Sequence, residues 1–299
     1  MRIEEIGRRG RTFTFTGTES ALGDYTVYLI EGDKRFYLCD THLGPRSMEG
    51  IIEYIKGRGA TKPLVVFLTH SDWDHIWGVC AFAKPLVVAH ELCAHNIAQR
   101  GELDLQRYAN YRRGDVWLVP PTLTFDSRLT FADDQVEFIH APGHTADSAL
   151  CHDRQDGVIY LGDLVERPRP VIGWHDLEKY IDTLEFLGEQ PARAFVSSHS
   201  GLVTLEDIEK NLTFLRSCQY SLQKEGLQAE DTGLNKLYTL LLFEEAIAET
   251  LGQSFDYRAF QLRLWQSLDL DYLDTVPNLL KNVTREELRL ALESLLAEC

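Results

Sequence analysis

Two imidazoles and two carboxylates lie within six residues of one another in the segment His70-Ser-Asp-Trp-Asp-His75. Carboxylates packed that closely repel one another and raise each other's pKa, and a bound divalent cation removes the conflict. His70, Asp72 and Asp74 alternate along the chain, so in a strand-to-loop turn their side chains can point the same way, with His75 beside them. The segment therefore predicts a metal site, and the alternative is a solvated acidic loop with incidental histidines.

The elements that must position these side chains are strands. A continuous apolar run, Leu64–Leu68, precedes the segment and is typical of a buried strand. Three later predicted strands also end in a His or Asp at a turn: Val136–His140 before His144, Val158–Leu161 before Asp163, and Ala194–Val196 before His199. Pro142 and Gly143 force a sharp bend just before His144. Each residue alone would be unremarkable, and the order of all of them is the informative feature.

That order resembles the metallo-β-lactamase superfamily, whose first motif usually reads HxHxDH and is followed by a separate His, a bridging Asp and a final His. The resemblance covers about residues 20–205 and includes Asp40-Thr41, where the family often has a strand ending in Asp-Thr-Gly. It implies an α+β fold, a four-layer αββα sandwich of two mixed sheets with helices outside. The metals would lie at one edge of the sheets.

Carried over residue by residue, the resemblance implies two metal ions with these ligands: His70, Asp72 and His144 for one, Asp74, His75 and His199 for the other, and Asp163 as the bridge. Two divalent ions lower the pKa of a bridging water and supply hydroxide at neutral pH. Asp74 would orient this nucleophile or shuttle its proton. An Asp at position 163, where true zinc β-lactamases have a Cys, points to the glyoxalase II-like and lactonase-like branches and away from antibiotic hydrolysis.

The expected function is a dinuclear metal-dependent hydrolase of a small ester, thioester, lactone or phosphodiester. Asp72 stands where most members have a second His, and a carboxylate makes the site harder, so iron or manganese is considered beside zinc. One alternative is a di-iron oxidoreductase related to the flavodiiron proteins, which have a Glu there. Nothing in the chain has the composition or length of their flavodoxin domain. The other alternative is a metal-binding regulatory member without activity.

Other histidines and aromatic residues are expected outside the ligand set. His90 and His95 are five apart, which is not the spacing of one helix face, and we interpret them as surface or packing residues. His42 stands where the family usually has Gly; we interpret it as a surface residue, with pocket lining as the alternative. Trp73 and Trp77 are expected to pack and not to form a substrate platform. The expected neighbours of the ligands are Thr69, Ser71 and Thr145.

Composition restricts the partners. The chain of 299 residues has 44% apolar and 25% charged residues and a formal net charge of -16, which argues against a general nucleic-acid or anionic-membrane binder. The expected partner is the small-molecule substrate that the resemblance implies. The N-terminus lacks the apolar region of a secretion signal, and no stretch approaches the about 18 apolar residues of a membrane span. Six scattered cysteines without a CxxC pair predict reduced thiols and a cytoplasmic location.

The predicted organisation is a catalytic domain over residues 1–203 and an all-helical appendage over residues 204–299. Thr204-Leu-Glu-Asp207 is a capping pattern that opens the appendage, which would cap the pocket or form a homodimer face. Earlier in the chain, Ser47 is the expected cap of a helix, and Val116–Val119 is a predicted strand. The polar, helix-prone segment Ile97–Arg113 is predicted to be an insertion or a helix that covers part of the site mouth.

Overall fold

The computed structural model describes residues 1–17, 23–58, 62–174 and 176–224. The chain divides into two compact units, one formed by Met1–Val171 with Lys179–Leu212 and the other by Ile172–Glu178 with Thr213–Cys299. The first unit contains both sheets and every predicted ligand. Most of the predicted appendage lies outside the described residues, so its role and the homodimer stay predictions.

The first sheet has seven strands in chain order: β1 (Arg2–Ile6), β2 (Gly10–Phe15), β3 (Tyr25–Glu31), β4 (Phe36–Cys39), β5 (Leu64–Leu68), β6 (Leu86–His90) and β7 (Leu123–Phe125). Neighbours are antiparallel from β1 to β4 and parallel from β4 to β7. In the parallel register Cys39 pairs with Phe67. The residues that follow β4 and β5, Asp40 and Thr69, therefore meet at one edge of the sheet.

The second sheet has six strands in the order β13-β12-β11-β10-β9-β8. Their bounds are β8 (Arg128–Phe131), β9 (Val136–His140), β10 (Ala149–Asp153), β11 (Val158–Tyr160), β12 (Ala194–Ser197) and β13 (Gly201–Val203). Only β11 and β12 pair in parallel within this sheet. His144, Asp163 and His199 follow β9, β11 and β12 respectively. Both sheets are mixed, as the α+β sandwich requires.

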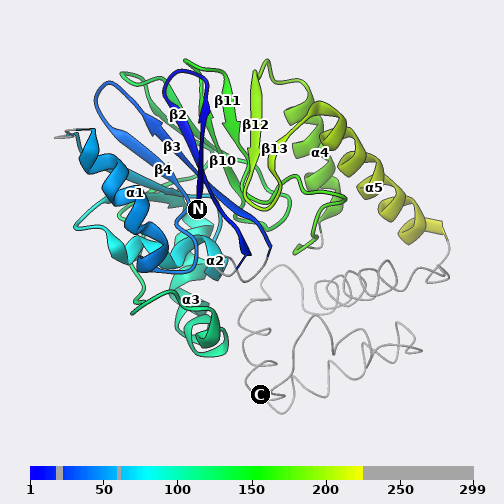
Figure 1. Ribbon diagram of the computed structural model, residues 1–299. Coiled ribbons are helices and arrows are strands. Elements are labelled where there is room, and N and C mark those ends of the chain that lie inside the picture. Colours follow the sequence, from blue (N-terminus) through cyan, green and yellow to red (C-terminus); the bar gives the residue numbers. More distant parts are fainter. Residues whose placement is uncertain (18–22, 59–61, 175, 225–299) are drawn as a thin grey trace, which may run out of the picture. The chain divides into compact units, whose positions relative to one another are not determined.

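Alternate strand residues build the layers. Inward side chains of both sheets form one core, in which Phe67 of β5 stacks on Phe138 of β9 with ring centroids 4.1 Å apart. The outward residues of the first sheet pack against α1 (Pro45–Gly57) and α3 (Glu91–Arg107). α4 (Leu177–Gly188) buries Leu184 and Leu187, and α1 and α4 lie on opposite sides of the sheets (Figure 1). The predicted four-layer αββα fold is confirmed.

Two predicted element boundaries are wrong. Val116–Val119 is not a strand, because its apolar side chains pack against the α3 side of the first sheet without pairing to a strand. Ser47 is not the cap of α1, which begins at Pro45 after Gly44. Proline suits the first helical position because the N–H that it lacks would have no partner within the helix. Ser47 contacts His42 instead, with Oγ 3.1 Å from Nδ1.

Other elements begin earlier or follow the expectation closely. α3 begins at Glu91, six residues before the predicted helical insertion, because His90 caps it by accepting a hydrogen bond from Leu92 N. The short helices α2 (Trp73–Ile76), η2 (Trp77–Ala81) and η3 (Ala109–Tyr111) flank it in the sequence. α5 (Leu205–Lys224) opens with the predicted box, in which Asp207 N donates to Thr204 Oγ1 and Thr204 N to Asp207 Oδ2.

Three strands, β1, β10 and β13, had no clear sequence signal, whereas the predicted strand Phe13–Thr16 overlaps β2. β10 buries the polar Asp153, which forms an ion pair with the buried Arg9 between β1 and β2. Such a pair hides the alternation by which a strand is recognised. Among the described residues, the side chains of Cys39, Cys80, Cys93, Cys151 and Cys218 are buried and form no disulfide. Across the described ranges, every helix is too short or too polar to cross a membrane.

Candidate metal centre

The seven predicted ligands converge at one edge of the two sheets. They come from the turn after β5 (His70, Asp72), from α2 (Asp74, His75) and from the turns after β9 (His144), β11 (Asp163) and β12 (His199). Two groups of three have ligand atoms within 4.8 Å of one another: His70, His144 and Asp163, and Asp74, His75 and His199. We call His70, Asp72 and His144 the first half-site and Asp74, His75 and His199 the second half-site.

Asp163 is the common neighbour of both half-sites. Its Oδ2 lies 3.2 Å from His75 Nε2 and 3.4 Å from His199 Nε2, both in the second half-site. The same oxygen lies 3.9 Å from His70 Nε2 and 3.9 Å from His144 Nε2, both in the first. One carboxylate oxygen therefore faces four imidazole nitrogens.

The other two carboxylates each belong to one half-site. Asp72 Oδ2 lies 3.4 Å from His144 Nε2 and 3.5 Å from His70 Nε2. Asp74 Oδ2 lies 3.3 Å from His199 Nε2. This division follows the ligand sets that the resemblance implied, and Asp72 lies beside the first group without belonging to its three mutually close atoms.

The imidazoles are oriented by contacts at their outer nitrogens. The Nδ1 partners are Thr69 Oγ1 for His70 (3.0 Å), Asp40 Oδ2 for His75 (2.9 Å) and Val171 O for His144 (3.0 Å). Each Nε2 then points inward, and those of His70 and His75 are buried without a hydrogen-bond partner among the described residues, as is Asp163 Oδ1. Unpartnered buried polar atoms are rare, and a His anchored through one nitrogen is typical of a metal ligand. The donor set fits divalent cations.

The charges of the cluster also favour a cation. Burial would raise the pKa of Asp163, but the charges of His75 and His199 outweigh it and hold that pKa well below its usual range. Burial lowers the pKa of His199, yet Asp163 and its neighbours raise it to about 11. The same competition, with a hydrogen bond to Asp72, raises the pKa of His144 to about 9. Without a metal, protons on the imidazoles offset the carboxylates, and a binding metal ion would displace them.

Asp40 contacts the predicted ligand His75, and the sequence analysis named it only as the start of the Asp-Thr pair that resembles the family's Asp-Thr-Gly. It is fully buried, its Oδ1 accepts from Thr69 N (2.9 Å), and its Oδ2 accepts from Thr69 Oγ1 (2.8 Å) and Tyr160 OH (3.1 Å). Because it also contacts His75 Nδ1, this carboxylate connects the turn after β5, helix α2 and strand β11. Its left-handed φ of 62° is tolerated best by Asp, Asn and Gly. An Asp directly after a strand was the available signal.

Arg100 contacts a predicted ligand, and the sequence reasoning missed it. It lies on α3 and its Nη2 donates to Asp72 Oδ1 and to Ser71 Oγ, the latter at 3.1 Å. Burial would raise the pKa of Asp72, but the Arg100 charge and the neighbouring histidines hold it well below its usual range. An Arg on a polar helix normally indicates a solvated face, so the sequence carried no signal for this contact. Of the predicted neighbours, Ser71 also donates its N–H to Asp147 Oδ2.

The surface interpretation of His42 is wrong. Its side chain is buried, stacks on Phe15 with ring centroids 4.5 Å apart, and contacts Tyr25 at the same centroid distance. Burial lowers the pKa of His42 to about 3. Its φ of 55° lies in the left-handed region, which explains why this position of the family usually has Gly. Tyr25 in turn lies against His199, with ring centroids 5.1 Å apart.

His90, His95, Trp73 and Trp77 have packing or surface positions. His90 is buried and stacks on His140 with ring centroids 3.8 Å apart, whereas His95 is exposed. Trp77 is buried in the core on the α3 side, and Trp73 stacks on Tyr108 at 4.6 Å. These contacts agree with the sequence interpretation.

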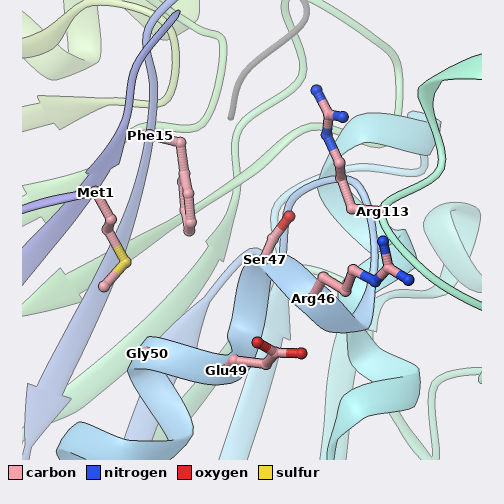
Figure 2. Close-up of a pocket in the computed structure, with 7 residues that line it drawn as sticks. All are labelled: Met1, Phe15, Arg46, Ser47, Glu49, Gly50 and Arg113. Atoms are coloured by element: carbon pink, nitrogen blue, oxygen red, sulfur yellow. The ribbon is translucent and has the colours of Figure 1, made fainter. Parts of the chain in front are cut away.

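A cavity of about 450 Å³ lies beside the N-terminal half of α1 (Figure 2). Figure 2 shows Met1 and Phe15 on one side, facing the α1 side chains, and the lining residues are Met1, Phe15, Arg46, Ser47, Glu49, Gly50 and Arg113. None of these seven is a predicted ligand. His42 contacts two of them, Phe15 and Ser47. It also contacts Tyr25, which lies against His199 of the second half-site.

Comparison with known proteins identifies the family. Residues 22–199 match the family model described as the metallo-beta-lactamase superfamily. The acyl-coenzyme A thioesterases MBLAC2 of Bos taurus and of Homo sapiens are each 26% identical over 199 residues, covering 57% of this chain and 69% of the relative. A solved metallo-beta-lactamase from Pontibacter korlensis has a TM-score of 0.57 at 20% identity and covers 72% of this chain and 98% of that one. This structural likeness supports the fold.

Proposed function

The chain belongs to the metallo-beta-lactamase superfamily, and from that premise we propose that it is a dinuclear metal-dependent hydrolase of a small thioester or ester. Lactones and phosphodiesters are the further candidate substrates. The observation that carries the proposal is the position of Asp163 Oδ2, between 3.2 and 3.9 Å from the Nε2 atoms of four histidines in two half-sites.

In this proposal the first half-site would hold one divalent ion, the second half-site would hold another, and Asp163 would serve as a ligand in both. Zinc is the expected metal, and iron and manganese are alternatives. The bound ions would supply a hydroxide nucleophile at neutral pH and a Lewis acid for the oxygen that gains charge. The unpartnered Nε2 atoms of His70 and His75 support this assignment, since nothing else in the described chain satisfies them.

The residues of the chain would perform the remaining steps. Asp74 holds one oxygen 3.3 Å from His199 Nε2, and a carboxylate there can orient the attacking water or carry its proton to the leaving group. Asp40 would hold His75 in the tautomer whose Nε2 is available, because Asp40 Oδ2 accepts a hydrogen bond from the Nδ1–H of His75.

The substrate class is inferred from the relatives. The relatives from Bos taurus and Homo sapiens both carry the name acyl-coenzyme A thioesterase. A thioester suits a site of this kind, because attack on its carbonyl develops an oxyanion that cationic groups stabilise. The flavodiiron alternative loses its main support, because the extra carboxylate that suggested it, Asp72, is paired with Arg100.

The test combines metal loading with a substrate panel. The zinc-loaded protein should hydrolyse acyl-coenzyme A thioesters, detected by release of free thiol, faster than aryl esters, lactones, phosphodiesters or β-lactams. Removal of the metal with a chelator should abolish the activity, and zinc should restore it. A metal-loaded protein that cleaves none of these substrates would favour the non-catalytic regulatory alternative.

The matched variants are Asp163→Asn and Asp133→Asn. Asp163→Asn should lose metal from both half-sites and nearly all activity, because the amide removes the charge that both share. Asp133 is an exposed carboxylate paired with Arg35, so Asp133→Asn should retain both metals and full activity. Two metal ions per chain in Asp163→Asn would contradict the bridging role.

A further inference from the structure

Arg100 and Asp72 form an ion pair at the rim of the first half-site. The two oxygens of Asp72 have separate partners: Oδ1 accepts from Arg100 Nη2, and Oδ2 lies 3.4 Å from His144 Nε2 and 3.5 Å from His70 Nε2. The side chains keep only 16% and 26% of their surface exposed. The carboxylate is therefore divided between an arginine outside and two imidazoles inside.

Arg100 is itself held from two directions. Its Nη2 donates to Ser71 Oγ at 3.1 Å, and its Nε lies 3.6 Å from Asp104 Oδ2, one turn further along α3. The turn that contains Ser71 is also held through its backbone, where Ser71 N donates to Oδ2 of the buried Asp147. A guanidinium in this position is not a mobile surface charge.

The charges of the pair cancel. Replacing the imidazole of an HxHxDH motif by a carboxylate adds one negative charge, and the guanidinium adds one positive charge beside it. Arg100 and Asp72 together therefore carry the same net charge as one neutral histidine. The guanidinium offsets the extra negative charge that Asp72 suggested from the sequence, and it also lies 3.6 Å from the buried Asp104.

We propose that Arg100 is a positioning residue that, with Asp72, replaces the missing histidine of the first half-site as a unit. By holding Oδ1, it presents only Oδ2 to the metal ion. By offsetting the charge, it keeps the half-site suited to zinc and prevents a shift toward manganese or iron. This inference rests on the metal-binding part of the proposed function.

If Arg100 and Asp72 act as a unit, replacing either residue alone should weaken metal binding, and replacing both should restore it. Asp72→His installs the ligand that most members of the family have, but it leaves the Arg100 guanidinium beside the first half-site without the carboxylate that accepts from its Nη2. Arg100→Met removes the group that orients Asp72 and leaves the carboxylate charge uncompensated. The double substitution Asp72→His with Arg100→Met restores both the ligand and the charge balance.

The experiment measures zinc affinity by competition with a chromophoric chelator, and zinc content by elemental analysis, in the full chain and these three variants. Each single substitution should weaken zinc binding in the first half-site by about 10- to 100-fold. The double variant should bind within about threefold of the unmodified protein, since its ligand and charge are both conventional. Arg100→Met should also raise the ratio of manganese to zinc affinity.

Two further variants separate positioning from general destabilisation. Arg100→Lys keeps the charge without the planar fork and should lose less zinc affinity than Arg100→Met. Arg107→Met, on the same helix, should leave zinc affinity unchanged. Thermal unfolding in chelator identifies any variant that is not folded, and Arg100→Lys then carries the comparison.

Either of two results would overturn the inference. One is a double variant that binds zinc more weakly than both single variants; the other is Asp72→His binding zinc as tightly as the unmodified protein. If the unmodified protein binds no zinc, manganese or iron at all, the proposed function fails together with this inference. Zinc binding without coupling between the two positions would overturn only the inference.

Discussion

The two half-sites use the same kinds of side chain but are held by different parts of the fold. In the second, His75 is anchored by Asp40, and both side chains are fully buried at the edge of the first sheet. In the first, Asp72 keeps a quarter of its surface exposed and is anchored by Arg100 of α3, on the outer side of that sheet. One anchor belongs to the core and the other to a covering helix.

This difference predicts how each half-site can change. Removing one partner of a fully buried pair leaves a charge that nothing else can satisfy, so the structure and the site fail together. A pair near the surface can be exchanged as a unit while the sheets stay intact. We therefore expect changes around the second half-site to be large and not repairable, and those around the first to be repaired by a partner substitution.

Asp40→Ala is the strongest test of this contrast. It leaves His75, Thr69 and Tyr160 without their shared acceptor and should lower the free energy of unfolding by about 3–5 kcal/mol. Zinc should be lost mainly from the second half-site, so elemental analysis of the folded variant should give about one metal per chain, half the content of the intact dinuclear site.

Asp134→Ala is the matched control for Asp40→Ala. Asp134 is also buried and accepts hydrogen bonds from Tyr37 OH and Lys34 N, but it lies at the opposite end of β9 from the ligand turn. Asp134→Ala should lower the free energy of unfolding without changing the metal content. Equal loss of metal from both half-sites in Asp40→Ala would contradict the contrast.

The pH dependence of the metal-free protein should distinguish the half-sites with a moderate effect. The pKa of His144 is raised to about 9 and that of His199 to about 11, against about 6.5 in an unfolded chain. Protons on these residues stabilise the fold fully below pH 6.5, and this stabilisation is lost as the pH rises through each folded pKa. The free energy of unfolding should therefore fall from pH 6.5 to 9.5.

Urea denaturation in the presence of chelator measures this fall. His144→Ala should make it shallower because only the second half-site then contributes, and His95→Ala, an exposed control, should not change it. A stability that stays constant or rises over this range would show that the imidazoles do not hold these protons.

His42→Gly should have the smallest effect. Glycine accepts the φ of 55° without strain, and relief of that strain offsets the lost ring contacts with Phe15 and Tyr25, for a net change of about 1 kcal/mol or less. Metal content should be unchanged. His42→Val, with a branched side chain at the same φ, should be clearly less stable by thermal unfolding. Loss of metal in His42→Gly would show that the ring contacts of His42 with Phe15 and Tyr25 support the second half-site.

Several local features were predictable from the sequence because they depend on neighbours in the chain. The apolar run Leu64–Leu68 and the turn that follows it appear as expected, as does the capping box at Thr204. Val116–Val119 was predicted wrongly, because β-branched residues that pack on a helix resemble those that pair in a sheet. The seven candidate ligands were named from the resemblance to the metallo-β-lactamase superfamily, and the strands that they follow end at one edge of the sheets.

By itself, the sequence determined the residue types, their order and the strands that deliver them, which is enough to name the fold and the candidate ligands. Only the tertiary structure decided which groups hold those ligands. Asp40 reaches His75 across 35 positions of the chain, and Arg100 reaches Asp72 across 28. Such pairs leave no periodic pattern, because their geometry arises from the packing of one element on another. The charge of the first half-site, and with it the expected metal, therefore depends on a contact between α3 and the β5 turn.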